Sequence, residues 1–113
     1  MLISLDHDGT YTLNPAFWDD FIKLAQEHGN AVHIVTLRDA VKDRLASERH
    51  LIDLGCMIIY CDGRPKKEVA KERGYSYAIW IEDDPRCIHE GSRLTDEQLA
   101  EWRSKDPYRA PGG

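Results

Sequence analysis

The sequence predicts an α/β fold in which a parallel sheet lies between two layers of helices. One observation is that short apolar runs rich in β-forming residues alternate with longer segments whose apolar residues recur at helical spacing. Another is that Gly29, Gly55 and Gly74 lie at boundaries between these segments. Such alternation implies parallel strands joined by right-handed helical crossovers, with helices on both faces of the sheet.

Four strands are expected, each a short apolar run. They occupy residues 1–5, 31–36, 56–61 and 77–81. The second is nearly continuous in apolar character, which is typical of a strand buried on both faces. His33 lies inside it. Because no partner lies at metal-ligand spacing, we interpret this residue as a hydrogen-bonded strand histidine.

Four helices are expected between and after these strands. They cover residues 15–29, 39–54, 65–74 and a segment that begins at Thr95. Asn14 and Pro15 supply an N-cap and a proline at the first helical position, and Thr95 with Gln98 fits a capping box. The apolar residues expected to anchor the first two helices are Phe17, Phe21, Leu24, Ala25, Val41, Leu45, Leu51 and Leu54.

Composition is that of an ordinary globular protein. The 113 residues are 42% hydrophobic and 31% charged, and a chain of this length is close to the common size of one domain. We expect residues 1–104 to form a single domain. Residues 105–113, which contain two prolines and two glycines, are expected to form a flexible tail.

Charge and hydropathy limit the partners and the location. A formal net charge of −5 argues against nonspecific binding to nucleic acids or anionic membranes. No apolar run approaches the roughly 20 residues that span a bilayer, and no basic segment precedes an apolar one as in a signal peptide. Three cysteines without a Cys-x-x-Cys pair are most simply free thiols, so a cytoplasmic location is expected.

Two carboxylates follow the first strand one residue apart. Asp6 and Asp8 point to the same side if the strand stays extended. Two nearby carboxylates repel each other unless a cation lies between them, and a hard divalent cation with oxygen ligands meets that need. The alternative is structural, in which Asp8 and Gly9 form only a turn and Asp6 caps the strand end.

Polar residues also lie past the ends of the later strands. Thr36, Lys66 and Asp83 each fall in such a position. The carboxyl ends of parallel strands share one edge of the sheet, where open α/β sheets bind their ligands. We therefore expect these residues to meet Asp6 and Asp8 at that edge, which would combine acids, a hydroxyl and a cation.

From its start to Pro85 the chain resembles the haloacid dehalogenase-like (HAD) superfamily, whose members are mostly phosphatases. The Asp-x-Asp-Gly-Thr motif of the superfamily stands here as Asp6-His7-Asp8-Gly9-Thr10, and Thr36 matches its second motif. The resemblance implies the HAD type of three-layer Rossmann-like fold. The connections at residues 10–14 and 62–65 are too short for the lid that many members insert, so it also implies a member without a cap domain.

Two further motifs of the superfamily can be placed. The lysine of the third motif is Lys66 or Lys67, and Lys66 is favoured because Val69 and Ala70 then match buried helix positions. The acidic pair of the fourth motif is residues 82–83 or residues 83–84. Asp83 belongs to both pairs, which makes it the safer metal ligand.

The resemblance implies a chemical role for each of these residues. Asp6 would form an aspartyl-phosphate, and Asp8 would protonate the leaving oxygen and then activate water. Thr36 would hydrogen-bond a phosphoryl oxygen, and Lys66 would add positive charge. Mg²⁺ would be held by Asp6, the backbone carbonyl of Asp8 and Asp83. The residues expected to bind substrate are Gly9, Thr10, Arg38 and Lys67. A local basic rim would consist of Arg38, Arg64, Lys66 and Lys67.

Two residues depart from the superfamily pattern. His7 stands where an apolar or aromatic residue is common; it is either a passive residue or one that touches the substrate. Glu82 is longer than the usual Asp. An open site excludes water poorly, so a member without a cap tends to act on large substrates or to close its site with a second subunit, here a homo-oligomer.

The expected function is that of a Mg²⁺-dependent phosphatase acting on a phosphorylated substrate. The phosphomonoester is left open: a small molecule, a nucleotide, a polynucleotide end or a phosphoprotein. One alternative is a non-catalytic interaction module on the same fold. Another is a phosphoacceptor receiver domain, although such domains carry the acceptor Asp after a later strand.

Overall fold

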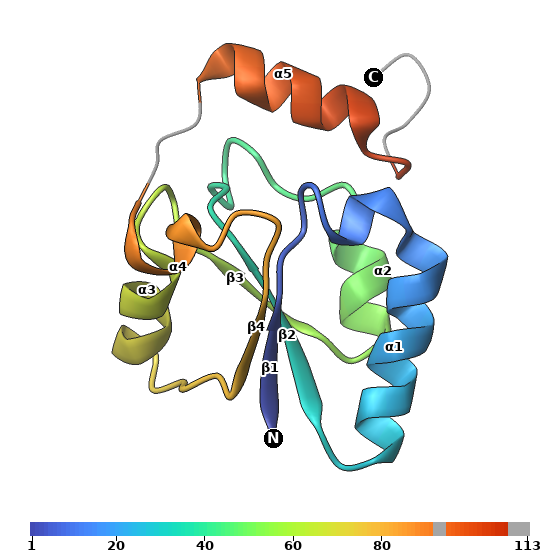
Figure 1. The fold of residues 1–113 in the computed structure, drawn as a ribbon. Coiled ribbons are helices and arrows are strands. Elements are labelled where there is room, and N and C mark those ends of the chain that lie inside the picture. Colours follow the sequence, from blue (N-terminus) through green and yellow to red (C-terminus); the bar gives the residue numbers. More distant parts are fainter. Residues whose placement is uncertain (92–94, 109–113) are drawn as a thin grey trace.

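The computed structural model describes residues 1–91 and 95–108 (Figure 1). Strands and helices alternate as predicted, and three of the four strands are one or two residues shorter than expected. In chain order the elements are β1 (Leu2–Leu5), the 3-10 helix η1 (Tyr11–Leu13), α1 (Pro15–Glu27), β2 (Ala31–Thr36), α2 (Glu48–Asp53), β3 (Met57–Tyr60), α3 (Lys66–Glu72), β4 (Ile79–Ile81), α4 (Arg86–His89) and α5 (Asp96–Lys105).

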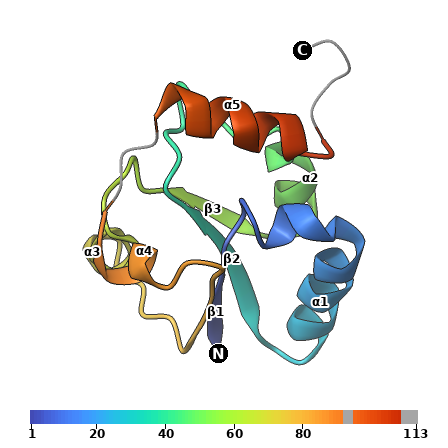
Figure 2. The same cartoon turned by 45° about the horizontal axis from the view of Figure 1, so that its top comes forward.

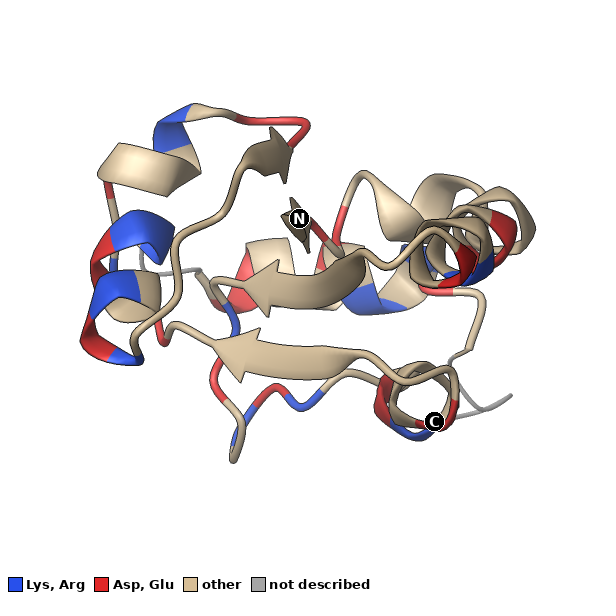
Figure 3. Cartoon of the chain, turned by 90° about the horizontal axis from the view of Figure 1, so that it is seen from below, with Lys and Arg blue, Asp and Glu red and all other residues tan. Residues whose placement is uncertain are grey.

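The strands form one sheet in the order β3-β2-β1-β4, and all neighbouring pairs are parallel. Helices α1 and α2 lie on one side of the sheet, and α3 and α4 lie on the other (Figure 1). The strands contain no Asp, Glu, Lys or Arg, which fall in helices and connections (Figure 3). This confirms the predicted fold class, a three-layer Rossmann-like α/β fold with a parallel sheet.

No domain is inserted into the connections at the expected site. Only η1 lies between β1 and α1, and residues 61–65 lead directly from β3 to α3. The fold therefore has no inserted cap of the kind that these connections would carry, as predicted.

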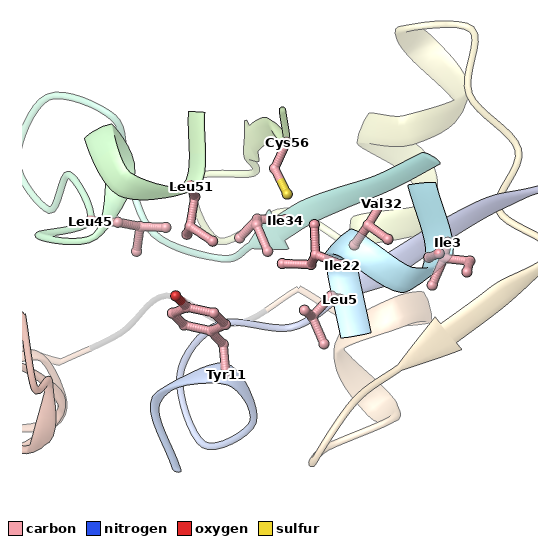
Figure 4. Close-up of a cluster of buried hydrophobic side chains, with 10 residues drawn as sticks. Ile3, Leu5, Tyr11, Ile22, Val32, Ile34, Leu45, Leu51 and Cys56 are labelled. Carbon is pink, nitrogen blue, oxygen red and sulfur yellow. The ribbon is translucent and has the colours of Figure 1, made fainter. Parts of the chain in front are cut away.

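Two hydrophobic cores hold the three layers together. Ile34 of β2 packs with Ile22 of α1 and Leu51 of α2 (Figure 4). The next residue, Val35, packs on the other side of the sheet with Val69 of α3. Successive strand residues point to opposite faces, so one strand feeds both cores. Each fully buried aliphatic side chain contributes about 1.5–3 kcal/mol.

The second helix is much shorter than the predicted span of residues 39–54. Only α2 is helical in this span. The Asp39 carboxylate accepts hydrogen bonds from the backbone N–H groups of Val41 and Lys42, at 3.3 and 2.8 Å, as an N-cap does, but the turn that follows does not continue as a helix. Val41 is 88% exposed, so its prediction as a core anchor is wrong. Leu45 and Leu51 are buried, as expected.

The first helix is rotated relative to the predicted apolar face. Ile22 and Ala25 are its buried residues, with Trp18 and Phe21 packed partly against the same core. Phe17 and Leu24 are each 55% exposed. They lie two turns apart on the flank of the helix, so only part of the predicted stripe faces the core.

The C-terminal segment is more ordered than the expected tail. Helix α5 begins with the predicted capping box of Thr95 and Gln98 and includes Lys105. Asp106 is buried, and the ring of Tyr108 stacks on Tyr11. The described part of the expected tail is therefore packed, and residues 109–113 lie outside the described residues. Among the helices of the described chain, none has the length and apolar character needed to cross a membrane.

Candidate active site at the carboxyl edge of the sheet

The strand order creates a crevice between the carboxyl ends of β1 and β4. The chain moves outward from β1 to β2 and β3 and then returns to the other side of β1 for β4. In open α/β sheets, ligands bind at the point where the strand order reverses. A hydrogen bond of 2.9 Å from the Asp6 N–H to the Ile81 carbonyl continues the pairing to the very end of both strands. The acidic segments that follow β1 and β4 therefore begin side by side.

Lys66 links these two acidic segments. Its ammonium donates to Asp6 Oδ1 at 2.8 Å and to Glu82 Oε1 at 2.5 Å, and its side chain is 1% exposed. Burial alone would lower the pKa of Lys66, but attraction to both carboxylates outweighs it and raises that pKa. Lys67 is exposed and lines a different cavity, beside Trp80. Of the two candidate lysines, only Lys66 faces the site.

Asp6, Glu82 and Asp83 form a cluster of potential metal ligands. One carboxylate oxygen from each lies within 4.8 Å of the others. Burial raises the pKa of Asp6 well above its usual range, and the nearby Asp83 and Glu82 carboxyl groups add to this rise against the opposing effect of Lys66. Glu82 Oε2 is buried and has no hydrogen-bond partner among the described residues. The cluster thus has more negative charge and acceptor capacity than Lys66 alone satisfies.

The Asp8 carboxylate lies outside this cluster and pairs with Arg38. Arg38 Nε donates to Asp8 Oδ2 at 2.8 Å, and Nη2 donates to Oδ1 at 2.5 Å. Burial would raise the pKa of Asp8, but hydrogen bonds from His7 and Arg38 outweigh it and lower that pKa. The strand ends at Leu5, so its two-residue alternation stops there, and the Asp8 carboxylate is not one of the clustered metal ligands, although both residues line one cavity.

Arg38 was expected on an exposed basic rim, but it is only 2% exposed. Its guanidinium is directed at Asp8 rather than at solvent. The signal that could have shown this is its position two residues after a buried strand end, next to an edge already rich in acid.

His7 extends the polar network away from the sheet edge. Its Nε2 lies 2.8 Å from Ser47 Oγ and its Nδ1 lies 3.4 Å from Asp8 Oδ1. The imidazole also stacks on Tyr11. The order Ser47, His7, Asp8 is that of a hydrolase triad. However, Ser47 and His7 are fully buried, so this serine is not accessible as a nucleophile and the network orients the loop.

Gly9 brings the two acidic segments into contact. Its φ of +83° lies in the left-handed region, and a Cβ at this position would collide with the Asp83 carboxylate. Glycine is the residue that tolerates both conditions. The neighbouring Thr10 hydroxyl donates to Asp6 Oδ2 at 3.0 Å, so in this structure it orients Asp6.

A cavity of about 110 Å³ joins the predicted catalytic residues. It is lined by Asp6, Asp8, Thr36, Leu37, Lys66, Asp83, Asp84, Cys87 and Trp102. The Thr36 hydroxyl oxygen accepts from the Arg38 N–H at 3.2 Å, which leaves its own proton free to donate. Trp102 comes from α5 and was not expected here, because nothing in its local sequence indicates where that helix lies.

A second cavity of about 240 Å³ adjoins the first and shares Asp8, Asp83 and Trp102 with it.

Comparison with protein-family models finds no match for this chain. Comparisons with curated proteins and with solved structures likewise find none. The geometry therefore supports a Rossmann-like α/β fold with a polar site at its reversal point, built from residues that the sequence had marked and from others that it had not.

Proposed function

We propose that this protein is a Mg²⁺-dependent phosphohydrolase of the HAD type that cleaves a phosphomonoester through an aspartyl-phosphate. The observation that carries the proposal is the placement of Asp6 and Lys66, whose charged groups meet at 2.8 Å in a cavity also lined by Thr36 and Asp8. A carboxylate, an ammonium and a hydroxyl on one small cavity are the groups that phosphoryl transfer needs. The resemblance of residues 6–10 to the Asp-x-Asp-Gly-Thr motif supports the same chemistry.

The first step transfers the phosphoryl group to the protein. A carboxylate oxygen of Asp6 attacks phosphorus, the bond from phosphorus to the leaving oxygen breaks, and that oxygen takes a proton from Asp8. Thr36 donates to a phosphoryl oxygen, and Lys66 offsets the charge of the transferring group. Arg38 and His7 lower the pKa of Asp8, and Arg38 contacts both of its oxygens, so Asp8 can act as an acid only after substrate binding displaces Arg38 and raises that pKa.

The second step releases phosphate. Water attacks the phosphorus of the aspartyl-phosphate and gives a proton to Asp8, and the bond between phosphorus and the Asp6 oxygen breaks. Asp6 is restored as a carboxylate, and inorganic phosphate leaves. General acid and base help of this kind is worth about 10²–10⁴-fold in rate.

The residues of the site fit a divalent cation. Asp6, Glu82 and Asp83 offer oxygen ligands close together, and the unpartnered Glu82 Oε2 is an acceptor that a hard cation would satisfy. Burial and the neighbouring carboxyl groups raise the pKa of Asp6, and added positive charge beside Asp6 would favour the carboxylate form that attacks phosphorus. Bound Mg²⁺ would neutralise charge on the transferring phosphoryl group.

Hydrolysis of p-nitrophenyl phosphate, with and without Mg²⁺, tests the proposal. We expect metal-dependent turnover that Asp6→Asn abolishes while the fold is retained. Lys66→Ala should lower the rate by at least 10²-fold, and Lys67→Ala is the matched control because Lys67 faces another cavity. Full activity in Asp6→Asn would refute the assigned nucleophile.

One observation favours a non-catalytic interaction module instead. Most of the charged side chains of the site already have partners, since Arg38 pairs with Asp8 and Lys66 pairs with both Asp6 and Glu82. A closed network of this kind can also be purely structural, in which case it stabilises the fold and binds no ligand. Calorimetry with Mg²⁺ separates the two functions, because a module of this sort would show neither turnover nor metal binding.

A further inference from the structure

Helix α5 lies across the carboxyl ends of the strands, over the candidate active site (Figures 1 and 2). None of its ten residues is buried, so it is not part of either core. Arg103 joins it to the Asp43 carboxylate and to the Lys42 carbonyl. Just after the helix, Tyr108 stacks on His50. The helix is therefore a cover attached near its C-terminal end.

Trp102 is the residue of α5 that takes part in both cavities of the site. In the larger cavity its indole shares the lining with Gly9, Thr12 and Leu13 from the segment after β1. Leu13 is 78% exposed, and Trp102 is only partly buried. An apolar ring and an aliphatic side chain that both remain accessible offer contact surface to a flat group.

The larger cavity also touches Asp8. If Asp8 protonates the leaving oxygen, as in the proposed function, then the group attached to that oxygen extends into this cavity. The volume of about 240 Å³ is below the range of roughly 300–1,000 Å³ typical of pockets for drug-sized ligands. A small organic group therefore fits, and a protein domain does not.

Charge around the larger cavity disfavours an anionic leaving group. Its one lysine, Lys105, donates to Glu101 at 2.8 Å, and Asp8 and Asp83 are acids on the same lining. The nearby Arg38 is held by Asp8. Among the described residues, the lining thus holds no cation without an acidic partner that could receive a second phosphate.

We infer that Trp102 forms a wall of a leaving-group subsite and that the protein selects small phosphomonoesters whose leaving group carries an uncharged planar ring, such as a nucleoside. The inference rests on the proposed function for the direction in which the leaving group points. Stacking of a base on an aromatic side chain is worth about 1–3 kcal/mol, so Trp102 should change the rate ratio between substrates with and without a ring by about tenfold.

Uridine 5′-monophosphate and ribose 5-phosphate test this subsite, because they share the same primary leaving oxygen and differ by the base. We expect the wild-type protein to favour the nucleotide in kcat/KM by about tenfold. Trp102→Ala should remove that preference by lowering kcat/KM for the nucleotide more than for ribose 5-phosphate, and Trp102→Phe should keep most of the preference.

Leu99→Ala is the matched control on the same helix. Leu99 lines a different cavity, beside Leu37 and Lys42, so its truncation loosens α5 without changing the leaving-group lining. The preference for the nucleotide should survive in this variant. If Leu99→Ala removes it as fully as Trp102→Ala does, Trp102 has no specific role and the inference fails.

Binding to Asp6→Asn keeps the inference testable without catalysis. If the wild-type protein hydrolyses both substrates equally, or Trp102→Ala slows both equally, the subsite is refuted while the proposed function stands. A different outcome is that neither substrate is hydrolysed, but calorimetry shows that Asp6→Asn binds the nucleotide more tightly than ribose 5-phosphate. If the Asp6→Asn, Trp102→Ala double variant loses this preference, the role of Trp102 as a wall of the subsite is supported and the proposed function fails. No turnover and no such binding preference would overturn both.

Discussion

At the scale of single residues, the site depends on buried cations held by buried acids. Arg38 is 2% exposed and meets Asp8 through two hydrogen bonds, and Lys66 joins Asp6 to Glu82. A buried ion pair stabilises a fold little compared with an apolar pair, but losing one partner leaves a charge uncompensated. The same residues are thus needed for folding and for the proposed chemistry.

Arg38→Met should lower the free energy of unfolding by about 3–5 kcal/mol, because it leaves the Asp8 carboxylate buried and without its main partner. Arg38→Lys should recover only part of this, since lysine lacks the planar fork that contacts both oxygens. Urea denaturation measures both changes. Arg64→Met is the control, because Arg64 pairs with Glu68 and Glu72 at the surface, and its loss should lower stability far less. Equal losses in the two methionine variants would contradict the assigned role of the buried pair.

His33 makes stability depend on pH. Burial lowers its pKa, and its Nδ1 lies 2.8 Å from the Tyr77 hydroxyl. Below the unfolded value of about 6.5, the unfolded chain binds a proton that the folded chain does not. Stability should therefore fall as pH decreases below about 6.5 towards the folded pKa. Part of this loss between pH 7.5 and pH 5.5 should disappear in His33→Gln.

Tyr77→Phe is the control for that measurement. It removes the phenolic hydroxyl but keeps the ring and the buried His33 imidazole. The stability measured by thermal unfolding should therefore keep most of its wild-type slope against pH over the same range. A slope in His33→Gln that equals the wild-type slope would show that another group causes the pH dependence.

At the scale of elements, the sequence predicted those features that depend on local pattern. The four strands, the cap of α1 at Asn14 and the capping box of α5 at Thr95 were all placed correctly. Lys66 was favoured over Lys67 from the buried positions of Val69 and Ala70, and only Lys66 faces the site. Each of these depends on residues within about one turn of the position concerned.

The meeting of Asp6, Thr36, Lys66 and Asp83 at one sheet edge was predicted from the strand ends, but other features that depend on distant contacts were not. The helix expected at residues 39–54 forms only at α2, and residues 39–47 are turns and irregular chain. The Asp8 carboxylate pairs with Arg38, and this pairing depends on where β2 ends beside β1. Trp102 reaches the site only because α5 folds back over the sheet edge, which no local spacing indicates.

The turn at Gly9 should be the most sensitive backbone position of the site. Gly9→Ala both strains a residue with φ of +83° and drives a Cβ into the Asp83 carboxylate, whereas Gly74→Ala has the same φ and nothing near its Cβ. Gly74→Ala should therefore cost about 1 kcal/mol from conformation alone. Gly9→Ala should cost clearly more and should also weaken Mg²⁺ binding, as measured by urea denaturation and calorimetry. Similar values for the two variants would exclude a tight contact between Gly9 and Asp83.

At the scale of the whole molecule, metal binding and stability should be coupled through the acidic cluster. Asp6 is far in the sequence from Glu82 and Asp83, and the three residues lie together only in the folded state. A ligand that binds only the folded state stabilises it by about 2.7 kcal/mol at 100 times its Kd. Mg²⁺ should therefore raise the Tm of the wild-type protein.

Asp83→Asn should change both the stability of the metal-free protein and its stabilisation by Mg²⁺. The variant without metal should melt slightly higher, because one carboxylate of a repelling cluster is lost, and the rise in Tm with Mg²⁺ should shrink. Asp84→Asn is the control, since Asp84 pairs with Arg86 at the surface and is absent from the cluster. An unchanged response to Mg²⁺ in Asp83→Asn would show that Asp83 is not a ligand.

The order of the strands has a consequence for how the protein comes into being. β1, the first strand, lies between β2 and β4, the last, and parallel neighbours far apart in sequence form slowly because a long loop has to close first. A chain emerging from the ribosome can pair β1 with β2 early, but Asp6 gains Glu82 and Asp83 only after β4 has been synthesised and docked. The proposed chemistry at Asp6 would therefore have to wait for β4, so activity would report that this last strand has docked.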